Sequence, residues 1–330
     1  MQFKRSGLVP GRSFVNASLG AFMLFLAGCG NGAGETPPQP NAPAGLAANP
    51  GKSEGFSLPA VWSSRTLDRS VRDLALAGGA ASAIAVAYEG GGLQFFNLDG
   101  EFTTEIAELN VAEVSAGTYL EFGDAGLVLF PGIDQDRQLT AYIHSVSLDA
   151  PVEVALPIET TGPIEAVCSR TLGSTDVGDL ELAFWTPDDT IARQGTLGTD
   201  GDAFTFNAVQ GTTIPEGATG CALTRQGLVF NVSGTHVAAL DRKDALRLVF
   251  LIPTGRLTLA DHGSDAIPLS IRDGISVKMP SQIAAMDALG DPRAGGYPGG
   301  VIVVGGLTSS GHQLVFVDTA QLTANTPSMP

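Results

Sequence analysis

Ile84-Ala85-Val86-Ala87-Tyr88 is followed, after a glycine-containing turn, by Gly92-Leu93-Gln94-Phe95-Phe96-Asn97-Leu98-Asp99, and this pair of runs decides the fold class. Both runs are short, and they contain the β-branched and aromatic residues that are typical of strands. The same sequence of run, turn and second run ending at an aspartate recurs at 127–149, 228–241 and 301–318. The first two aspartates, Asp99 and Asp149, lie 50 residues apart, which is close to the repeat length of a propeller blade.

This pattern predicts an all-β chain, a β-propeller of five or six four-stranded blades. A β-sandwich with a long insertion is the alternative. Helical periodicity is scarce, and 283–289 is the best candidate for a helical turn, while 253–273 is expected to be an irregular loop. Strands are expected at 83–88, 93–98, 126–130, 139–146, 180–185, 227–232, 246–252, 300–304 and 313–317.

The N-terminal segment has the features of an export signal. Lys4, Arg5 and Arg12 precede an apolar run that ends in Leu26-Ala27-Gly28-Cys29. A basic start, a short apolar stretch and small residues before a cut are typical of a secretory signal. The run is shorter than the ~20 apolar residues of a membrane-spanning helix. The four residues at its end resemble the lipobox of bacterial lipoproteins, whose cysteine is acylated after cleavage.

The lipobox resemblance divides the chain into a lipoprotein signal peptide at 1–28, a lipidated cysteine with a disordered tether at 29–55, and a folded body at 56–330. It implies that Cys29 is acylated and that membrane lipid is a partner. Gly30 stands where lipoproteins retained at the inner membrane often have aspartate, so the resemblance implies the outer membrane of the cell envelope. The tether is rich in Gly, Pro, Ala and Asn and has no hydrophobic period with which to bury a core.

The charge of the chain limits its partners. It contains 18 basic and 34 acidic residues, a net charge of −16, which falls to −19 when the three basic residues of the signal peptide are removed. Nucleic acid is excluded as a partner because its binding requires a basic surface. Metal-binding cysteine patterns such as C-x-x-C are absent from the sequence. An exported chain permits a disulfide between Cys168 and Cys221, and two buried thiols are the alternative.

Five segments, in the same order along the chain, resemble the β-propeller phytases. The segment 91–100 is similar to their GGLYVYDLDG, and 109–111 falls where they have LNNVD. The segments 164–168 and 218–222 resemble YGLC and AEGCVAD, and 299–304 resembles the start of GGLLVVQDG. The resemblance implies a six-bladed propeller whose acidic mouth holds several calcium ions that bind phosphate and activate water. Such chemistry fits calcium, which takes about six to eight oxygen ligands.

Most of the acids implied by this resemblance are absent here. The family's aspartate-lysine before GGL is Tyr88-Glu89, and the glutamate of AEGC is Thr219. The opening DDPAIW motif has only Arg72-Asp73-Leu74-Ala75-Leu76 as its nearest approach. The remaining acids that match the family's site are Glu89, Glu113 and Glu165. We therefore expect a non-catalytic binding module whose partner is an envelope protein or a small anionic ligand. The alternative is a divergent calcium-dependent phosphomonoesterase, similar to 3-phytases, that hydrolyses phytate or related esters.

Two aspartate pairs are further candidates for calcium. Asp134 and Asp136, and likewise Asp200 and Asp202, have the D-x-D spacing that places two carboxylates in one turn. Neither pair continues into a complete calcium-binding loop, and aspartate also favours ordinary surface turns. A nucleophilic triad is not expected, because the sequence contains no G-x-S-x-G elbow.

Overall fold

The computed structural model describes residues 55–172, 178–232, 234–242, 245–261, 265–290 and 296–324. They belong to one compact unit, Lys52–Pro330. The predicted signal peptide at 1–28, the lipidated Cys29 and the predicted tether up to residue 54 lie outside the described residues. Within the described ranges, no helix is long and apolar enough to cross a membrane.

Strands dominate the described residues, which contain one short helix, α1 (Ala320–Ala324). The strands are β1 (Phe56–Ser63), β2 (Val71–Ala77), β3 (Ala83–Tyr88), β4 (Leu93–Asn97), β5 (Val111–Val114), β6 (Thr118–Phe122), β7 (Ala125–Asp134), β8 (Leu139–His144), β9 (Val152–Ala155), β10 (Ala166–Thr171), β11 (Leu180–Trp185), β12 (Ile191–Asp200), β13 (Ala203–Thr213), β14 (Gly220–Thr224), β15 (Gly227–Asn231), β16 (His236–Asp241), β17 (Leu246–Leu251), β18 (Leu257–Asp261), β19 (Ile267–Arg272), β20 (Gln282–Leu289), β21 (Val301–Thr308) and β22 (Gly311–Asp318).

Local sequence explains the hairpin of β3 and β4. Every residue of β3 is buried, as expected for a strand with protein on both faces. Gly90, Gly91 and Gly92 connect the two strands with φ of 80°, 103° and 103°. Residues other than glycine rarely adopt such positive φ angles, so the three glycines permit this turn.

In the described part of the chain, the strands form five hydrogen-bonded sheets. They are β2–β4, β5–β9, β10–β13, β14–β15 and an eight-stranded sheet in the order β16-β17-β18-β19-β1-β22-β21-β20. Strand β1 joins the two halves of the large sheet. It pairs in parallel with β19 over Phe56–Pro59 and antiparallel with β22 over Ala60–Ser63. The start of the folded body therefore completes a sheet made from the end of the chain.

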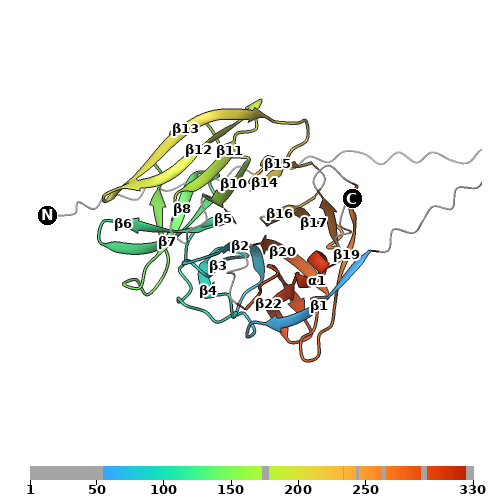
Figure 1. Ribbon diagram of the computed structural model, residues 1–330. Coiled ribbons are helices and arrows are strands. Elements are labelled where there is room, and N and C mark those ends of the chain that lie inside the picture. The colour runs from blue at the N-terminus through green and yellow to red at the C-terminus, as the bar shows by residue number, and fades with distance from the viewer. Residues whose placement is uncertain are drawn as a thin grey trace, which may run out of the picture. The chain divides into compact units, whose positions relative to one another are not determined.

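Six strands follow one another in a closed ring. They are the first strand of each of the four smaller sheets, β2, β5, β10 and β14, and the two end strands of the large sheet, β16 and β20. From here on we call these six strands the first strands. Strand β2 contacts β5 and β20, β16 contacts β20 and β14, and β14 contacts β10. The ring closes where Ser169 of β10 donates to the carbonyl of Ala116, just after β5, at 2.5 Å. Figure 1 shows β2, β5, β10, β14, β16 and β20 around one centre.

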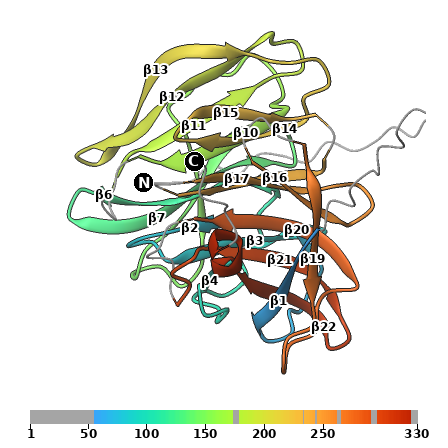
Figure 2. The ribbon, with the colours of Figure 1, turned by 45° about the vertical axis from the view of Figure 1, so that its right-hand side comes forward.

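Apolar cores lie between neighbouring sheets. One core joins β2–β4 to β20–β22, and a second joins β2–β4 to β5, β7 and β8. A third core lies between β6–β8 and β10–β12, and Trp185 contacts Phe230 between β11 and β15. Figure 2 shows the β10–β13 sheet beside β14 and β15. Apolar contacts therefore join β20–β22, β2–β4, β5–β9, β10–β13 and β14–β15 in turn.

The prediction of an all-β fold is confirmed, and each predicted strand overlaps a strand of the structure and extends at most two residues beyond it. The helical turn predicted at 283–289 is wrong, because these residues form β20 and pair with β21 along their length. The loop predicted at 253–273 is also wrong. Leu257, Leu259, Leu269 and Ile271 alternate with more exposed residues and are buried in one core, so this polar segment forms β18 and β19.

One predicted strand pair is also incorrect. The two runs at 228–241 belong to different sheets, since β15 pairs with β14 and β16 pairs with β17. The turn between them explains this, because Asn231 Oδ1 accepts the N–H of Gly234 at 2.8 Å. The chain turns there and starts the next sheet instead of forming a hairpin.

Candidate functional site

The ring of first strands encloses a cavity of about 930 Å³. Its walls come from β2, β5, β10, β14, β16 and β20 and from the residues that follow them. Small side chains keep it wide, among them Ala75, Ala112, Ala116, Ala166, Ala222 and Ala239. A cavity of this volume is in the range of small-molecule sites in proteins.

The neighbouring strands of the ring run in the same direction. Asp73 and Leu76 of β2 bond to Val114 and Gly117, in and after β5, in the same order. Ser169 and Thr171 of β10 likewise bond in order to the segment after β5. The cavity therefore has two ends, which we call the start mouth, at the beginnings of the first strands, and the finish mouth, at their ends.

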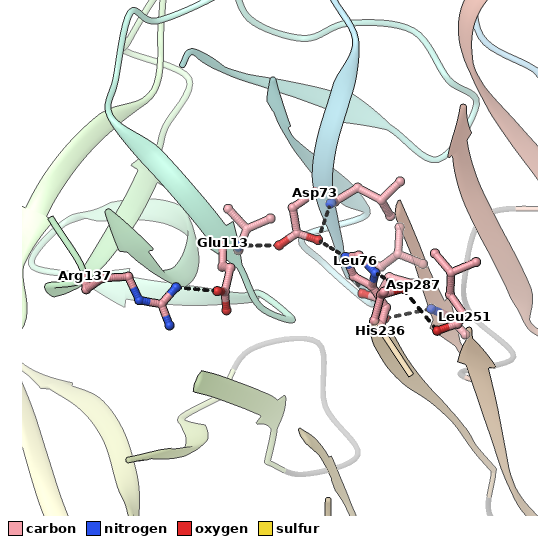
Figure 3. A network of polar contacts seen from close by, with 11 residues as sticks. Asp73, Leu76, Glu113, Arg137, His236, Leu251 and Asp287 are labelled. Carbon is pink, nitrogen blue, oxygen red and sulfur yellow. Dashed lines mark hydrogen bonds and ion pairs between the residues drawn. The ribbon is translucent and has the colours of Figure 1, made fainter. Parts of the chain in front are cut away.

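Asp73 lies at the start mouth and is buried. Its Oδ1 accepts the N–H of Leu74 at 2.9 Å, and its Oδ2 accepts the N–H of Val114 on β5 at 2.8 Å (Figure 3). The ladder between β2 and β3 shifts register between Val71 and Asp73, so Arg72 is the extra residue of a bulge. Bulges re-aim side chains, and this one precedes the carboxylate that reaches from β2 to β5.

His236, at the start of β16, is the partner of Asp73. Its Nε2 lies 3.2 Å from Asp73 Oδ1, and its Nδ1 lies 3.3 Å from the hydroxyl of Thr235. Burial alone would lower the pKa of His236, but the hydrogen bond and charge of Asp73, with the charges of Glu113 and Asp287, raise it above its ordinary value. The carboxylate of Asp73 therefore stabilises the protonated form of the His236 ring.

Asp287 on β20 connects that strand to β2. Its Oδ2 accepts the N–H of Leu76 at 2.7 Å, and its Oδ1 accepts the N–H of Ala288 at 2.7 Å (Figure 3). Asp287 borders the cavity, so its surface is only partly covered, but it lies deep within the protein. Burial raises its pKa to about 7, because the two N–H donors only partly offset the loss of hydration.

Glu113, predicted from the sequence as a remnant of an acidic site, does line the cavity. Its Oε1 accepts from Arg137 Nη1 at 2.6 Å, and Arg137 Nη2 also donates to the backbone carbonyl of Glu165. Burial raises the pKa of Glu113, against the lowering effect of Arg137. Arg137 therefore brings two of the three predicted remnants together, although Glu165 contributes its backbone rather than its carboxylate.

Glu89 is not part of this arrangement. It is exposed in the turn after β3, where its N–H donates to the carbonyl of Ser70 at 2.9 Å. The glutamate does not line the cavity.

The two aspartate pairs proposed for calcium lie in turns. Asp134 Oδ1 accepts the N–H of Gln138 at 2.7 Å beyond β7, and Asp136 belongs to the same turn. Asp200 and Asp202 lie at the hairpin between β12 and β13. Among the described residues, no three His, Cys, Asp or Glu side chains are grouped in a way that could hold a metal ion.

The carboxylates of the cavity do not fit a calcium site. Calcium needs several oxygens that converge on one point. Both oxygens of Asp73 and of Asp287 accept backbone N–H groups, and Glu113 is paired with Arg137. These acids connect neighbouring strands of the ring instead.

Cys168 and Cys221 are joined by a disulfide, with Cα atoms 5.7 Å apart. The bond connects β10 to β14 and lies in the wall of the cavity. Because β14 and β15 form a sheet of only two strands, the disulfide ties this small sheet to its larger neighbour.

Sequence reasoning did not select Asp73, His236 or Asp287 as site residues. A usable signal existed for Asp73, which lies in the segment identified as the nearest approach to the phytase opening motif. His236 and Asp287 carried no comparable signal, because their roles depend on partners in strands far away in the sequence.

The sequence matches no protein-family model and no curated protein. Among solved structures, AofleA from Arthrobotrys oligospora is 10% identical and covers 78% of this chain and 90% of its own, with a TM-score of 0.44. A mutant of AofleA with three arginines changed to alanine is 11% identical with the same coverage and a TM-score of 0.46. A mutant of Aleuria aurantia lectin in complex with Fucalpha1-6GlcNAc is 12% identical, covers 73% and 72%, and has a TM-score of 0.31. These values are too low to assign a ligand to this chain.

Proposed function

We propose that this chain is an envelope-anchored binding protein whose body is a six-bladed β-propeller and whose central cavity takes a small polar ligand without hydrolysing it. The blade count is supported by the ring of six first strands and by the apolar cores between consecutive sheets. The parallel contact of β1 with β19 divides the eight-stranded sheet into two runs of four. On this interpretation, β14 and β15 are a reduced blade.

One observation carries the non-catalytic assignment. The acids that line the start mouth are already engaged by protein donors, so they connect strands instead of coordinating ions. Removing a carboxylate from these donors to bind calcium would leave buried N–H groups without acceptors, at a cost of about 1–3 kcal/mol each. A cavity lined by small side chains remains open to a ligand.

Phosphate release from phytate by the full chain tests this assignment against the phosphomonoesterase alternative. We expect no release in millimolar calcium or in chelator. Calcium-dependent release that Glu113→Gln abolishes would overturn the proposal and restore the phytase-like enzyme. A commercial β-propeller phytase assayed in parallel provides the positive control.

Ligand binding is tested by thermal unfolding of the full chain against a panel of organic acids, sugar phosphates and the disaccharide Fucalpha1-6GlcNAc. A ligand that binds only the folded form stabilises it by RT ln(1 + [L]/Kd), about 2.7 kcal/mol at a concentration of 100 Kd. Ala239→Phe is the matched variant, because Ala239 lines the cavity while its neighbours Ala238 and Leu240 belong to an apolar core. A shift that persists in this variant would place binding elsewhere.

The anchor is tested separately. We expect the wild-type chain to fractionate with membranes and to incorporate labelled palmitate, and Cys29→Ser to do neither. This expectation is supported by the lipobox resemblance at Leu26-Ala27-Gly28-Cys29. Equal fractionation of the two chains would refute it.

A further inference from the structure

The finish mouth is lined by three arginines from consecutive members of the ring. Arg170 lies near the end of β10, Arg225 directly follows β14, and Arg242 directly follows β16. We call these three residues the arginine arc. Strand β14 contacts both β10 and β16, so the arc comes from adjacent strands.

The cavity lining is enriched in basic residues relative to the rest of the molecule. Four of the 15 Lys and Arg residues that follow Arg12 line the cavity, compared with four of the 34 Asp and Glu residues. Two of those four acids, Asp73 and Glu113, lie at the start mouth, and Asp287 is bonded to β2. Among the described residues, Asp241 is the cavity-lining acid of the finish mouth. Anions near this acidic protein therefore meet a locally cationic surface at this mouth.

The arginine arc already binds carboxylates. Arg170 Nη2 donates to Glu181 Oε2 at 2.7 Å. Arg225 Nε donates to Asp241 Oδ1 at 2.8 Å, and the backbone N–H of Arg225 donates to Oδ2 of the same carboxylate. These contacts hold two guanidinium groups in fixed positions. A planar guanidinium matches a carboxylate through paired N–H donors.

Arg170 retains an unused donor. Its side chain is 23% exposed, and its buried Nε has no hydrogen-bond partner among the described residues. The Nε atom itself is buried, so a ligand reaches Arg170 through the exposed part of its side chain. Arg242 is held by the carbonyl of Gly299, which accepts from its Nη1 at 2.7 Å.

We propose that the arginine arc binds the carboxylate of a small organic acid, with the rest of the ligand in the alanine-lined cavity. This inference rests on the proposed function of the cavity and names the class of its ligand.

Calorimetric titration of the full chain with succinate and citrate tests the proposal, with the neutral succinamide and with inorganic phosphate as comparison probes. We expect the carboxylates to bind and succinamide not to bind. Arg170→Gln and Arg242→Gln should each weaken carboxylate binding by at least about tenfold, since each removes a charged donor. Arg256→Gln is the matched control, because Arg256 is exposed and lies outside the cavity.

The double variant Arg170→Gln with Glu181→Gln covers the case in which loss of Arg170 alone unfolds the chain, because it leaves no unpaired charge in the pair. Full affinity in this variant and in Arg242→Gln would overturn the inference, as would equal binding of succinamide or tighter binding of phosphate. If the carboxylates do not bind but another probe does, and Ala239→Phe abolishes that binding, the inference fails and the cavity remains a binding site. If no probe of either panel binds, both proposals fail.

Discussion

Replacement of Asp287 by asparagine is expected to change how the stability of the fold depends on pH. Burial raises the pKa of Asp287 to about 7, while its two backbone N–H donors oppose that rise. An acid whose pKa is higher in the folded chain than in the unfolded chain binds more protons when folded, at every pH between the two values. The free energy of unfolding therefore falls as pH rises through this window. Asparagine has the shape of aspartate but does not titrate.

The size of the effect follows from the two pKa values. The unfolded value is 3.8 and the folded value is about 7. At about 1.4 kcal/mol for each pH unit, this interval corresponds to about 4 kcal/mol. Asp287 borders the cavity, where solvent screens the carboxylate, and the charges of Asp73 and His236 act on it in opposite directions, so this figure is an upper bound. The stabilisation is present below pH ~4 and is lost as pH rises to ~7.

Urea unfolding monitored by tryptophan fluorescence measures this effect, since Trp185 is buried beside Phe230. The unfolding free energy of the wild type minus that of Asp287→Asn should fall steadily from pH 4 to pH 8. Asp273→Asn is the control. Asp273 is exposed, and its hydrogen bonds from Lys278 and the N–H of Met279 lower its pKa. Its contribution to the unfolding free energy is therefore lost only as pH falls below the ordinary aspartate range. A difference for Asp287→Asn that stays constant or grows with pH would refute the reasoning.

Substitutions at three further places test the construction of the ring, each with a comparison and each by urea unfolding. Asp73→Ala leaves two backbone N–H groups and the His236 ring without their acceptor and should cost about 3–5 kcal/mol. Asp73→Asn retains one acceptor and should cost less, and equal losses would contradict the role of the charge. Replacing Cys168 and Cys221 together by serine should cost about 4 kcal/mol, given their separation of 53 residues, and reductant should have no effect on the double variant. Gly117→Ala should cost about 1–3 kcal/mol, because a Cβ there would lie 2.7 Å from a carbonyl oxygen and a phenyl ring; Gly162→Ala, which faces open space, should be nearly neutral.

The strands were predictable wherever the local pattern was strong. β3 and β11 begin and end where the runs of apolar residues do. The prediction failed at β20, where Ala, Met and Leu allow a helix and pairing with β21 decides otherwise. It also failed at β18 and β19, whose buried leucines and isoleucine alternate with polar residues. Local propensity is a weak guide in both cases because long-range pairing sets the outcome.

The candidate site was less predictable than the strands. Glu113, predicted as a remnant of an acidic catalytic site, lines the cavity, but nothing in the sequence indicated that Arg137 lies beside it. The aspartate pairs were selected by spacing alone, and that spacing is equally typical of turns. The arginines of the finish mouth are far apart in sequence and gave no motif. They line one mouth of the cavity because neighbouring first strands of the ring run in the same direction.

The acids of the cavity are better explained by the fold than by catalysis. Strand β2 pairs only with β3 within its sheet, and β5 pairs only with β7, so both are edge strands facing the ring. Edge strands carry backbone N–H groups that the sheet leaves unpaired. Asp73 accepts one from β5 and Asp287 accepts one from β2, each across the boundary between sheets. Removing those acceptors would leave buried donors, so the packed sheets require hydrogen-bond acceptors at these positions even without a metal.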